Sequence, residues 1–399
     1  TVVEEVVFDD DDEVIVASVR PRKGARRRCG ICERRCSGYD QGEGRRRWRT
    51  LDLGAIPTYL EAEAPRVACP DHGVVVASVP WARHDAGHTH GFDDTVAWLA
   101  THCSKSAVTE LMRVAWRTVG SIVTRVVADA REGTDPFDNL TRIGIDEISY
   151  KRGHKYLIVV VDHDSGNLVW AKPGRDKKTL NAFFDELGAE RCDKVRLVSA
   201  DGAEWIGEVV AARCANATRC MDPFHTVQWC TDALDEFRRD VWNAARKGGM
   251  KALAGDLNGA RFALWKNPED LTANQASKLS WIQKTNGQLY RAYLLKEQLR
   301  QVFKLRGDAG INLLKAWLAW ASRSKISAFV ELARTIRKHQ AAIEAALTHG
   351  LTNARVESVN TKIRLLQRGA FGYRDPDALI AMAMLDLGGC CPALPGRAA

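Results

Sequence analysis

The sequence lacks the features that direct a chain into or across a membrane. No run of about eighteen apolar residues occurs, so no membrane-spanning helix is expected. The first residues are acidic rather than basic and apolar, so no signal peptide is expected either. These absences predict a soluble cytoplasmic protein with no membrane partner, in which the 11 cysteines stay reduced or bind metal.

A strong net charge is also absent, because the chain carries only +8 over 399 residues. That length predicts roughly two or three domains of ordinary globular composition. The charge is concentrated locally, since 12 Lys or Arg residues and 3 acidic ones lie between Arg20 and Arg49. A solvated loop would show such a run, but we favour a phosphate-binding surface. The candidate DNA contacts in this segment are Arg26, Arg27, Arg28, Arg45, Arg46 and Arg47.

A metal-binding pattern lies inside this basic segment. Cys29 and Cys32 form one pair, and Cys69 and His72 form a second. Thiolate and imidazole side chains at this spacing are ligands of a tetrahedral, structural Zn²⁺. The gap between the pairs is longer than usual, so Cys36 remains an alternative ligand and His72 an alternative surface residue. Five other cysteines lie in apolar segments and are expected in the core: Cys103, Cys192, Cys214, Cys220 and Cys230.

Three short helical patterns follow, over Phe92–His102, Ser106–Arg113 and Thr118–Ala130, with Asp93 and Asp94 at the expected cap of the first and Ser104 at that of the second. Short helices with tight joins are typical of a helix-turn-helix, although a generic small bundle would look the same. Beside an arginine-rich zinc module we favour DNA binding, with the third helix as recognition helix. The candidate contacts here are Arg113, Arg117 and Arg125.

Three acidic residues stand at positions that favour a shared site. Asp146 ends a short apolar strand, and Asp201 follows the apolar run 195–198. Glu357 lies on a helical pattern far downstream. Carboxylates at strand ends lie at the rim of an α/β sheet, where ligands bind. Asp, Asp and Glu on strand, strand and helix indicate a two-metal phosphoryl-transfer site, although an isolated Asp-Gly is also common turn chemistry.

The segments around these residues predict a mixed sheet with helices, the layout of ribonuclease H. The expected strands are Arg142–Glu147, Lys155–Asp162, Asn167–Lys172, Lys194–Ala200 and Thr218–Met221, and the expected helices are Lys178–Leu187, Glu204–Cys214 and His225–Lys247. Residues 248–350 read as an all-helical insertion.

The helical pattern from Asn353 to Arg368 has two faces. Val356, Val359, Ile363 and Leu366 should pack on the sheet, whereas Glu357, Thr361, Arg364 and Arg368 share an adjacent face. That arrangement combines a metal ligand with phosphate-binding cations, although a plain amphipathic surface helix would show the same charges.

Four stretches closely resemble the DDE transposases of bacterial insertion sequences, in particular the ISL3 family. These stretches are 142–147, Ser199-Ala200-Asp201-Gly202, Met221-Asp222-Pro223-Phe224-His225 and 353–363. The Asp-Gly is the least specific of them. The sequence departs from the family pattern at His72, where Cys is common, and at Ala354, where Gly is frequent. Neither departure touches the three acidic residues.

The resemblance implies a multidomain α+β protein: an N-terminal zinc ribbon, a helix-turn-helix, and a ribonuclease H-like mixed α/β catalytic domain interrupted by an all-helical insertion. The expected segments are a zinc-binding DNA-recognition module 1–80, a helix-turn-helix domain 81–135, a first catalytic part 136–247, the insertion 248–350, a final catalytic segment 351–389 and a tail 390–399.

The resemblance also implies the chemistry. Asp146 would bridge two Mg²⁺ ions, which Mn²⁺ can replace, while Asp201 and Glu357 would each hold one. Asp222, His225 and Asn360 would support the site; Asp222 as a helix cap and His225 as a packed residue are the alternatives. Additional expected DNA contacts are Arg355, Lys362, Arg364 and Arg368.

The implied activity is binding of double-stranded terminal inverted repeats, metal-dependent nicking that exposes 3′-OH groups, and strand transfer into target DNA. A homodimer on paired ends and association with the bacterial nucleoid are expected. Two alternatives stay open: a structure-selective nuclease of ribonuclease H type, and a domesticated, inactive DNA-binding regulator.

Overall fold

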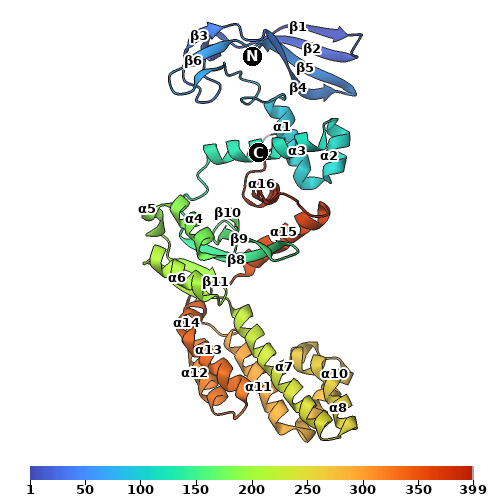
Figure 1. Ribbon diagram of the computed structural model, residues 1–399, viewed down its shortest axis with the longest axis vertical. Helices are drawn as coiled ribbons and strands as arrows, with labels where there is room; N and C mark the ends of the chain where they lie inside the picture. Colours follow the sequence, from blue (N-terminus) through green and yellow to red (C-terminus); the bar gives the residue numbers. More distant parts are fainter. Residues whose placement is uncertain (398–399) are drawn as a thin grey trace. The chain divides into compact units, whose positions relative to one another are not determined.

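The computed structural model describes residues 1–397, so positions 398 and 399 of the expected tail lie outside the described residues. Contacts divide the chain into two units. The first unit is Thr1–Pro136 together with the segment from Leu366 onward, and the second is Phe137–Leu365 (Figure 1).

The first unit begins with two small sheets. β1 (Val2–Asp9) and β2 (Val14–Arg20) form a hairpin, because an acidic turn separates two alternating segments. β5 (Ile56–Glu63) and β4 (Arg45–Leu53) complete a sheet in the order β1-β2-β5-β4. A second sheet contains β3 (Ser37–Asp40), β6 (Arg66–Cys69) and β7 (Gly73–Val76), and a short 3-10 turn covers Lys23–Ala25. The buried indole of Trp48 packs edge-on against Trp81.

The helices of this unit are α1 (His90–His102), α2 (Lys105–Met112), α3 (Trp116–Gly133) and α16 (Pro376–Leu387). The first cap was predicted wrongly, because Thr89 rather than Asp93 accepts the free backbone N–H of Phe92. Ser104 caps α2 in the same way, as expected.

Helix α16 lies against α1 and α3, so the contacts group it with the first unit rather than with the final catalytic segment 351–389 in which the sequence placed it. Its apolar side chains, including Leu379 and Leu385, are buried there. Cys103 was expected in the core but is exposed, because it ends α1 and faces the turn before α2.

The second unit contains a mixed sheet in the order β10-β9-β8-β11-β12, which confirms the predicted ribonuclease H-like layout. β8, β9 and β10 are antiparallel neighbours, while β11 runs parallel to both β8 and β12. The strands are β8 (Arg142–Lys151), β9 (Lys155–Asp162), β10 (Leu168–Pro173), β11 (Leu197–Ala200) and β12 (Thr218–Met221).

Helices α4 (Lys177–Leu187) and α6 (Glu204–Arg213) cover one face of this sheet, with the short α5 (Ala189–Cys192) beside them (Figure 1). Phe183 and Phe184 of α4 and Ile206 of α6 share a buried cluster with Ile143 and Ile145 of β8. The alternation along β8 therefore directs the odd-numbered residues to this core and the even-numbered ones to the opposite face.

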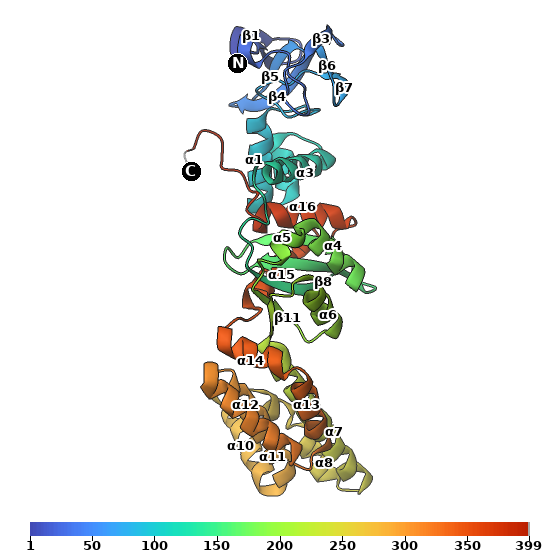
Figure 2. The same ribbon diagram turned by 90° about the vertical axis from the view of Figure 1, so that its left-hand side faces the viewer.

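Helix α15 (Ala354–Gly369) lies on that opposite face (Figure 2). A Cβ atom at Gly144 would lie 2.3 Å from a methyl carbon of Val356, so the missing side chain at residue 144 lets α15 approach β8 closely. Val356, Val359 and Ile363 are buried, as the spacing predicts, whereas Leu366 is only half-buried.

The remaining helices form the predicted insertion around one apolar core that includes the fully buried Trp317. The long α7 (Pro223–Lys247) leads from the sheet into this bundle (Figure 1). The others are α8 (Lys251–Asn258), α9 (Arg261–Trp265), α10 (Ala273–Thr285), α11 (Gly287–Val302), α12 (Gly307–Ser322), α13 (Ser327–Lys338) and α14 (Gln340–His349), with a 3-10 turn at Pro268–Asp270. In the described part of the chain, no helix is long and apolar enough to cross a membrane.

Candidate active site and zinc centre

Asp146 lies on the α15 face of β8 and is held there by two hydrogen bonds. The Asn360 side-chain amide donates to Oδ2 at 2.7 Å, and the Glu147 backbone N–H donates to Oδ1 at 2.8 Å. Burial raises the pKa of Asp146 to about 6, and the charge of Asp201 acts in the same direction while His225 opposes it. The carboxylate is therefore positioned at an electrostatic cost, which is typical of sites that bind cations or protons.

Asp201 follows β11 in a loop that hydrogen bonds hold in place. Its Oδ1 accepts the Ala203 backbone N–H at 2.9 Å, and the half-buried Arg219 guanidinium donates to the carbonyl oxygens of Asp201 and Ala203. A Cβ atom at Gly202 would lie 2.5 Å from the Trp229 ring of α7. The glycine of this Asp-Gly pair is thus required for close helix approach.

Glu357 is exposed in the first turn of α15. It precedes Asn360 by three residues, and residues at this spacing are neighbours on a helix surface. Because Asn360 contacts Asp146, the fold brings the Glu357 turn next to that strand. Among the described residues, however, Asp146, Asp201 and Glu357 do not form a group with all ligand oxygens within 4.8 Å of one another.

Asp222 and His225 lie at the start of α7, beside the same site. Asp222 occupies the N-cap position of α7, although its side chain makes no capping hydrogen bond there. Its Oδ1 instead accepts the Asn353 backbone N–H at 3.2 Å, while its buried Oδ2 has no hydrogen-bond partner. The charges of Asp222 and His225 both act on the pKa of Asp146, so the two residues are near neighbours of that carboxylate.

Glu147 follows Asp146 on β8, so its side chain lies on the opposite face of the sheet. It forms an ion pair with Arg175, which precedes α4 on the other side of the sheet. Burial raises the pKa of Glu147, and Arg175 opposes this.

The site has oxygen donors that fit a hard divalent cation. The donor set consists of carboxylates, the buried Asn360 Oδ1 has no hydrogen-bond partner, and Glu357 is free in solvent to turn toward Asp146. Mg²⁺ prefers such oxygens. The sequence prediction missed Arg219 and Asn353, because their roles depend on contacts with distant segments.

The structure brings the four predicted zinc ligands together. One ligand atom from each of Cys29, Cys32, Cys69 and His72 lies within 4.8 Å of the others. The Cys32–Cys69 sulfur separation is 3.7 Å, and His72 Nδ1 lies 3.5 Å from the Cys69 sulfur and 3.8 Å from that of Cys29. Tetrahedral Zn–S and Zn–N bonds of about 2.3 and 2.0 Å require edges of roughly 3.6–3.8 Å. Zn²⁺ therefore fits this site.

Cys36, the alternative ligand, lies outside this group and directs its thiol to the carbonyl of Arg34 at 3.3 Å. His72 is exposed, but its Nδ1 lies beside the thiols of Cys29 and Cys69. Burial would raise the pKa of Cys69, but hydrogen bonds led by that of His72 lower it to about 6. A thiolate, the form that binds zinc, is thereby favoured.

The predicted DNA-contacting arginines fall into two groups. Arg45 and Arg47 pair with Glu61 at 2.7 and 2.9 Å, and Arg46 donates to the Ala86 carbonyl at 2.8 Å, so all three are held in place along β4. Six others are exposed and form no ion pair within residues 1–397: Arg26, Arg27, Arg117, Lys362, Arg364 and Arg368. These are the cations most available to phosphate.

Four more of the predicted contacts are occupied within the protein. Arg28 donates to the Glu33 carbonyl, Arg113 to the Ala55 carbonyl and Arg355 to the Asp164 carbonyl. The Arg125 side chain reaches the fully buried Asp93 at 3.2 Å. Arg125 thus faces the interior of the first unit, because an unpaired buried carboxylate would be costly.

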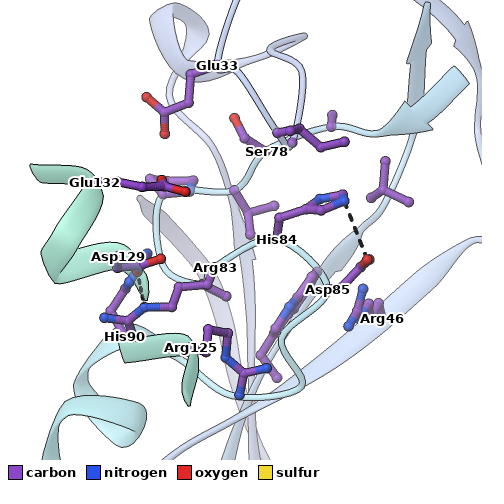
Figure 3. Close-up of a pocket in the computed structure, with 18 residues that line it drawn as sticks. Glu33, Arg46, Ser78, Arg83, His84, Asp85, His90, Arg125, Asp129 and Glu132 are labelled. Carbon is purple, nitrogen blue, oxygen red and sulfur yellow. Dashed lines mark hydrogen bonds and ion pairs between the residues drawn. The ribbon is translucent and has the colours of Figure 1, made fainter. Parts of the chain in front are cut away.

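A cavity of about 510 Å³ lies between the zinc module and the helix-turn-helix (Figure 3). Arg83 projects beside it toward Asp129 and also pairs with Asp94 at 2.9 Å, while His84 points toward Asp85. None of the three predicted catalytic carboxylates lines this cavity. Its lining combines apolar residues of the zinc module with charged residues of the helix-turn-helix segment.

Comparison with known proteins agrees with this arrangement. Residues 25–72 match a zinc-finger model of the transposases IS204, IS1001, IS1096 and IS1165, and residues 77–127 match the helix-turn-helix domain of transposase family ISL3. Residues 143–383 match the ISL3 DDE transposase model.

Named relatives cover nearly the whole chain. The transposase for insertion sequence element IS1557 of Mycobacterium tuberculosis, found in two strains, is 58% identical over 420 residues, which cover 100% of this chain and 95% of the relative. The transposase for insertion sequence element IS1001 of Bordetella parapertussis is 25% identical over 355 residues, covering 88% of this chain and 86% of the relative. The chain therefore belongs to the ISL3 family of DDE transposases.

Proposed function

We propose that this protein binds the terminal inverted repeats of its own insertion sequence, nicks the ends to expose 3′-OH groups and joins them to target DNA. The observation that carries the proposal is the bond between Asn360 of α15 and Asp146 of β8. This bond brings the helix that bears Glu357 to the strand that bears the half-buried Asp146. Hydrolysis and strand transfer are both displacements at phosphorus, so one site serves both.

Asp146, Asp201 and Glu357 would hold the divalent cations, for which we propose two Mg²⁺ ions that Mn²⁺ can replace. Such ions supply Lewis acidity at the attacking and leaving oxygens of an in-line displacement. Asn360 orients the Asp146 carboxylate by donating a hydrogen bond to Oδ2, while Oδ1 accepts the backbone N–H of Glu147. Asp222 and His225, at the start of α7, would support the site, with His225 near the scissile phosphate.

DNA recognition is assigned to the first unit. The zinc module and the helix-turn-helix carry the exposed Arg26, Arg27 and Arg117, which can neutralise phosphates. Lys362 and Arg364 of α15 would contact DNA beside the active site. We further propose a homodimer on paired ends, since two ends must meet before strand transfer, and association with the nucleoid.

The test is nicking of a labelled transposon-end duplex in Mg²⁺ by the full chain. Asp201→Asn is expected to abolish nicking and retain binding of the end, while Asp232→Asn, an exposed carboxylate on α7, serves as the matched control with normal nicking. End binding without nicking by the wild type would favour the inactive-regulator alternative. Cleavage that follows DNA structure rather than the end sequence would favour the nuclease alternative.

A further inference from the structure

Four buried polar residues are linked by hydrogen bonds, and three of them have no role in the proposed reaction. They are His163, Ser199, Asp222 and Asn353, each at most 4% exposed. They come from four parts of the second unit: the end of β9, the middle of β11, the end of β12 and the residue before α15. Buried polar groups are costly unless they are hydrogen-bonded, so their arrangement calls for an explanation.

Three of these residues form a directed hydrogen-bond chain. The Ser199 hydroxyl donates its single proton to Asn353 Oδ1. His163 Nε2 lies 2.7 Å from the same hydroxyl oxygen, so it must supply the N–H that Ser199 accepts. Burial lowers the pKa of His163 to about 4, which keeps the ring neutral.

The chain ends at the first turn of the helix that bears Glu357. The Asn353 carbonyl accepts the Glu357 backbone N–H at 2.8 Å, and the Asn353 N–H donates to Asp222 Oδ1 at 3.2 Å. The middle member of the chain, Ser199, lies on β11 two residues before Asp201. A short polar path thus joins the backbone of two proposed metal ligands that are far apart in sequence.

Apolar contacts alone would not fix this helix accurately. The contact of Val356 with Gly144 sets how closely α15 approaches β8, but apolar contact is non-directional and tolerates rotation or sliding. A shift by one residue turns a helix by about 100° and would carry Glu357 away from Asp146. The same shift would break buried hydrogen bonds, and each broken bond leaves an unsatisfied polar group.

We propose that His163, Ser199 and Asn353 are positioning residues that set the rotation and register of α15, and so place Glu357 opposite Asp146 and Asp201. This inference rests on the proposed three-carboxylate site. The chain contacts neither DNA nor metal, and acts through the backbone of α15 and β11.

The test is single-turnover nicking of a labelled end duplex at increasing Mg²⁺ concentration. Ser199→Ala should raise the half-saturating Mg²⁺ concentration roughly tenfold or more, as loss of outer partners of metal ligands does. The matched control is Ser324→Ala in the helical insertion, another buried serine whose hydroxyl accepts a backbone N–H at 3.2 Å. This control should keep the wild-type Mg²⁺ requirement whatever its effect on Tm.

A second pair of variants separates positioning from stability. His163→Gln keeps an N–H donor at the position of Nε2 and should retain the wild-type Mg²⁺ requirement, whereas His163→Leu should behave like Ser199→Ala. Equal Mg²⁺ requirements in the two His163 variants would overturn the proposal. If Ser199→Ala does not fold, the comparison of the two His163 variants tests the proposal by itself. A lowered Tm with an unchanged Mg²⁺ requirement in Ser199→Ala would also overturn it.

Failure of the active-site assignment gives a different result. Glu357→Gln must be inactive if that assignment is correct. If Glu357→Gln nicks like the wild type, the three-carboxylate site and the positioning proposal both fall. If Glu357→Gln is inactive while Ser199→Ala and His163→Leu match the wild type, only the positioning proposal falls.

Discussion

Replacing Asp146 by Asn should stabilise the metal-free protein while abolishing nicking. Burial raises the pKa of this carboxyl from 3.8 to about 6, with the charge of Asp201 adding to the shift. A shift of about two pKa units corresponds to roughly 3 kcal/mol between the two protonation states. Asp146→Asn removes this charge, so the free energy of unfolding should rise by up to about 3 kcal/mol at pH 7.5 in a chelator.

The local hydrogen bonds allow the substitution. The new amide oxygen can accept the Glu147 backbone N–H, as Oδ1 of Asp146 does now. Its NH₂ group can donate to Asn360 Oδ1, which has no partner at present, once the Asn360 amide turns over. The substitution therefore removes a buried charge without creating a cavity.

The sign of the pH dependence follows from the same shift. The folded-state pKa of Asp146, about 6, lies above the unfolded value of 3.8, so protonation stabilises the folded state. Wild-type stability should fall as pH rises through this window. The stability gap between Asp146→Asn and wild type should be complete above about pH 6 and absent below about pH 4.

Urea unfolding in EDTA at several pH values measures this gap, with the exposed Asp232→Asn as control. Adding Mg²⁺ should stabilise the wild type through binding and leave Asp146→Asn unchanged. A variant less stable than wild type in EDTA at pH 7.5, or a gap that does not depend on pH, would refute the reasoning.

Three further predictions follow from other contacts. Gly144→Ala should lower stability by about 1–3 kcal/mol and abolish nicking, because the new methyl collides with Val356; urea unfolding checks this, and Val356→Ala in the same chain should restore part of the loss. Cys69→Ser should release zinc and abolish specific end binding, measured by zinc content and mobility shift, and a variant that still binds zinc and ends would contradict the ligand set. Asp93→Asn should raise the free energy of unfolding at pH 7.5, because burial raises the pKa of Asp93 even though Arg125 and Arg83 lower it; a lower Tm in the variant would contradict this.

The sequence alone determined the features that depend on local pattern. Strand β9 begins and ends where the alternation predicts, and α15 buries the face that its spacing indicates. The zinc ligands followed from the spacing within each pair, because each pair closes one tight turn. The order of Asp146, Asp201 and Glu357 on strand, strand and helix was also readable, since each follows or lies within a clearly periodic segment.

Only the tertiary structure decided how these segments meet. Ser199 and Asn353 are 154 residues apart, and no local pattern shows that their side chains share a hydrogen bond. The Arg125 side chain of α3 points inward because it pairs with the buried Asp93 of α1, a contact that no local pattern shows either. The need for glycine at residue 144 is visible only once α15 lies on β8, because periodicity reports which face of a segment is apolar but not which partner covers it.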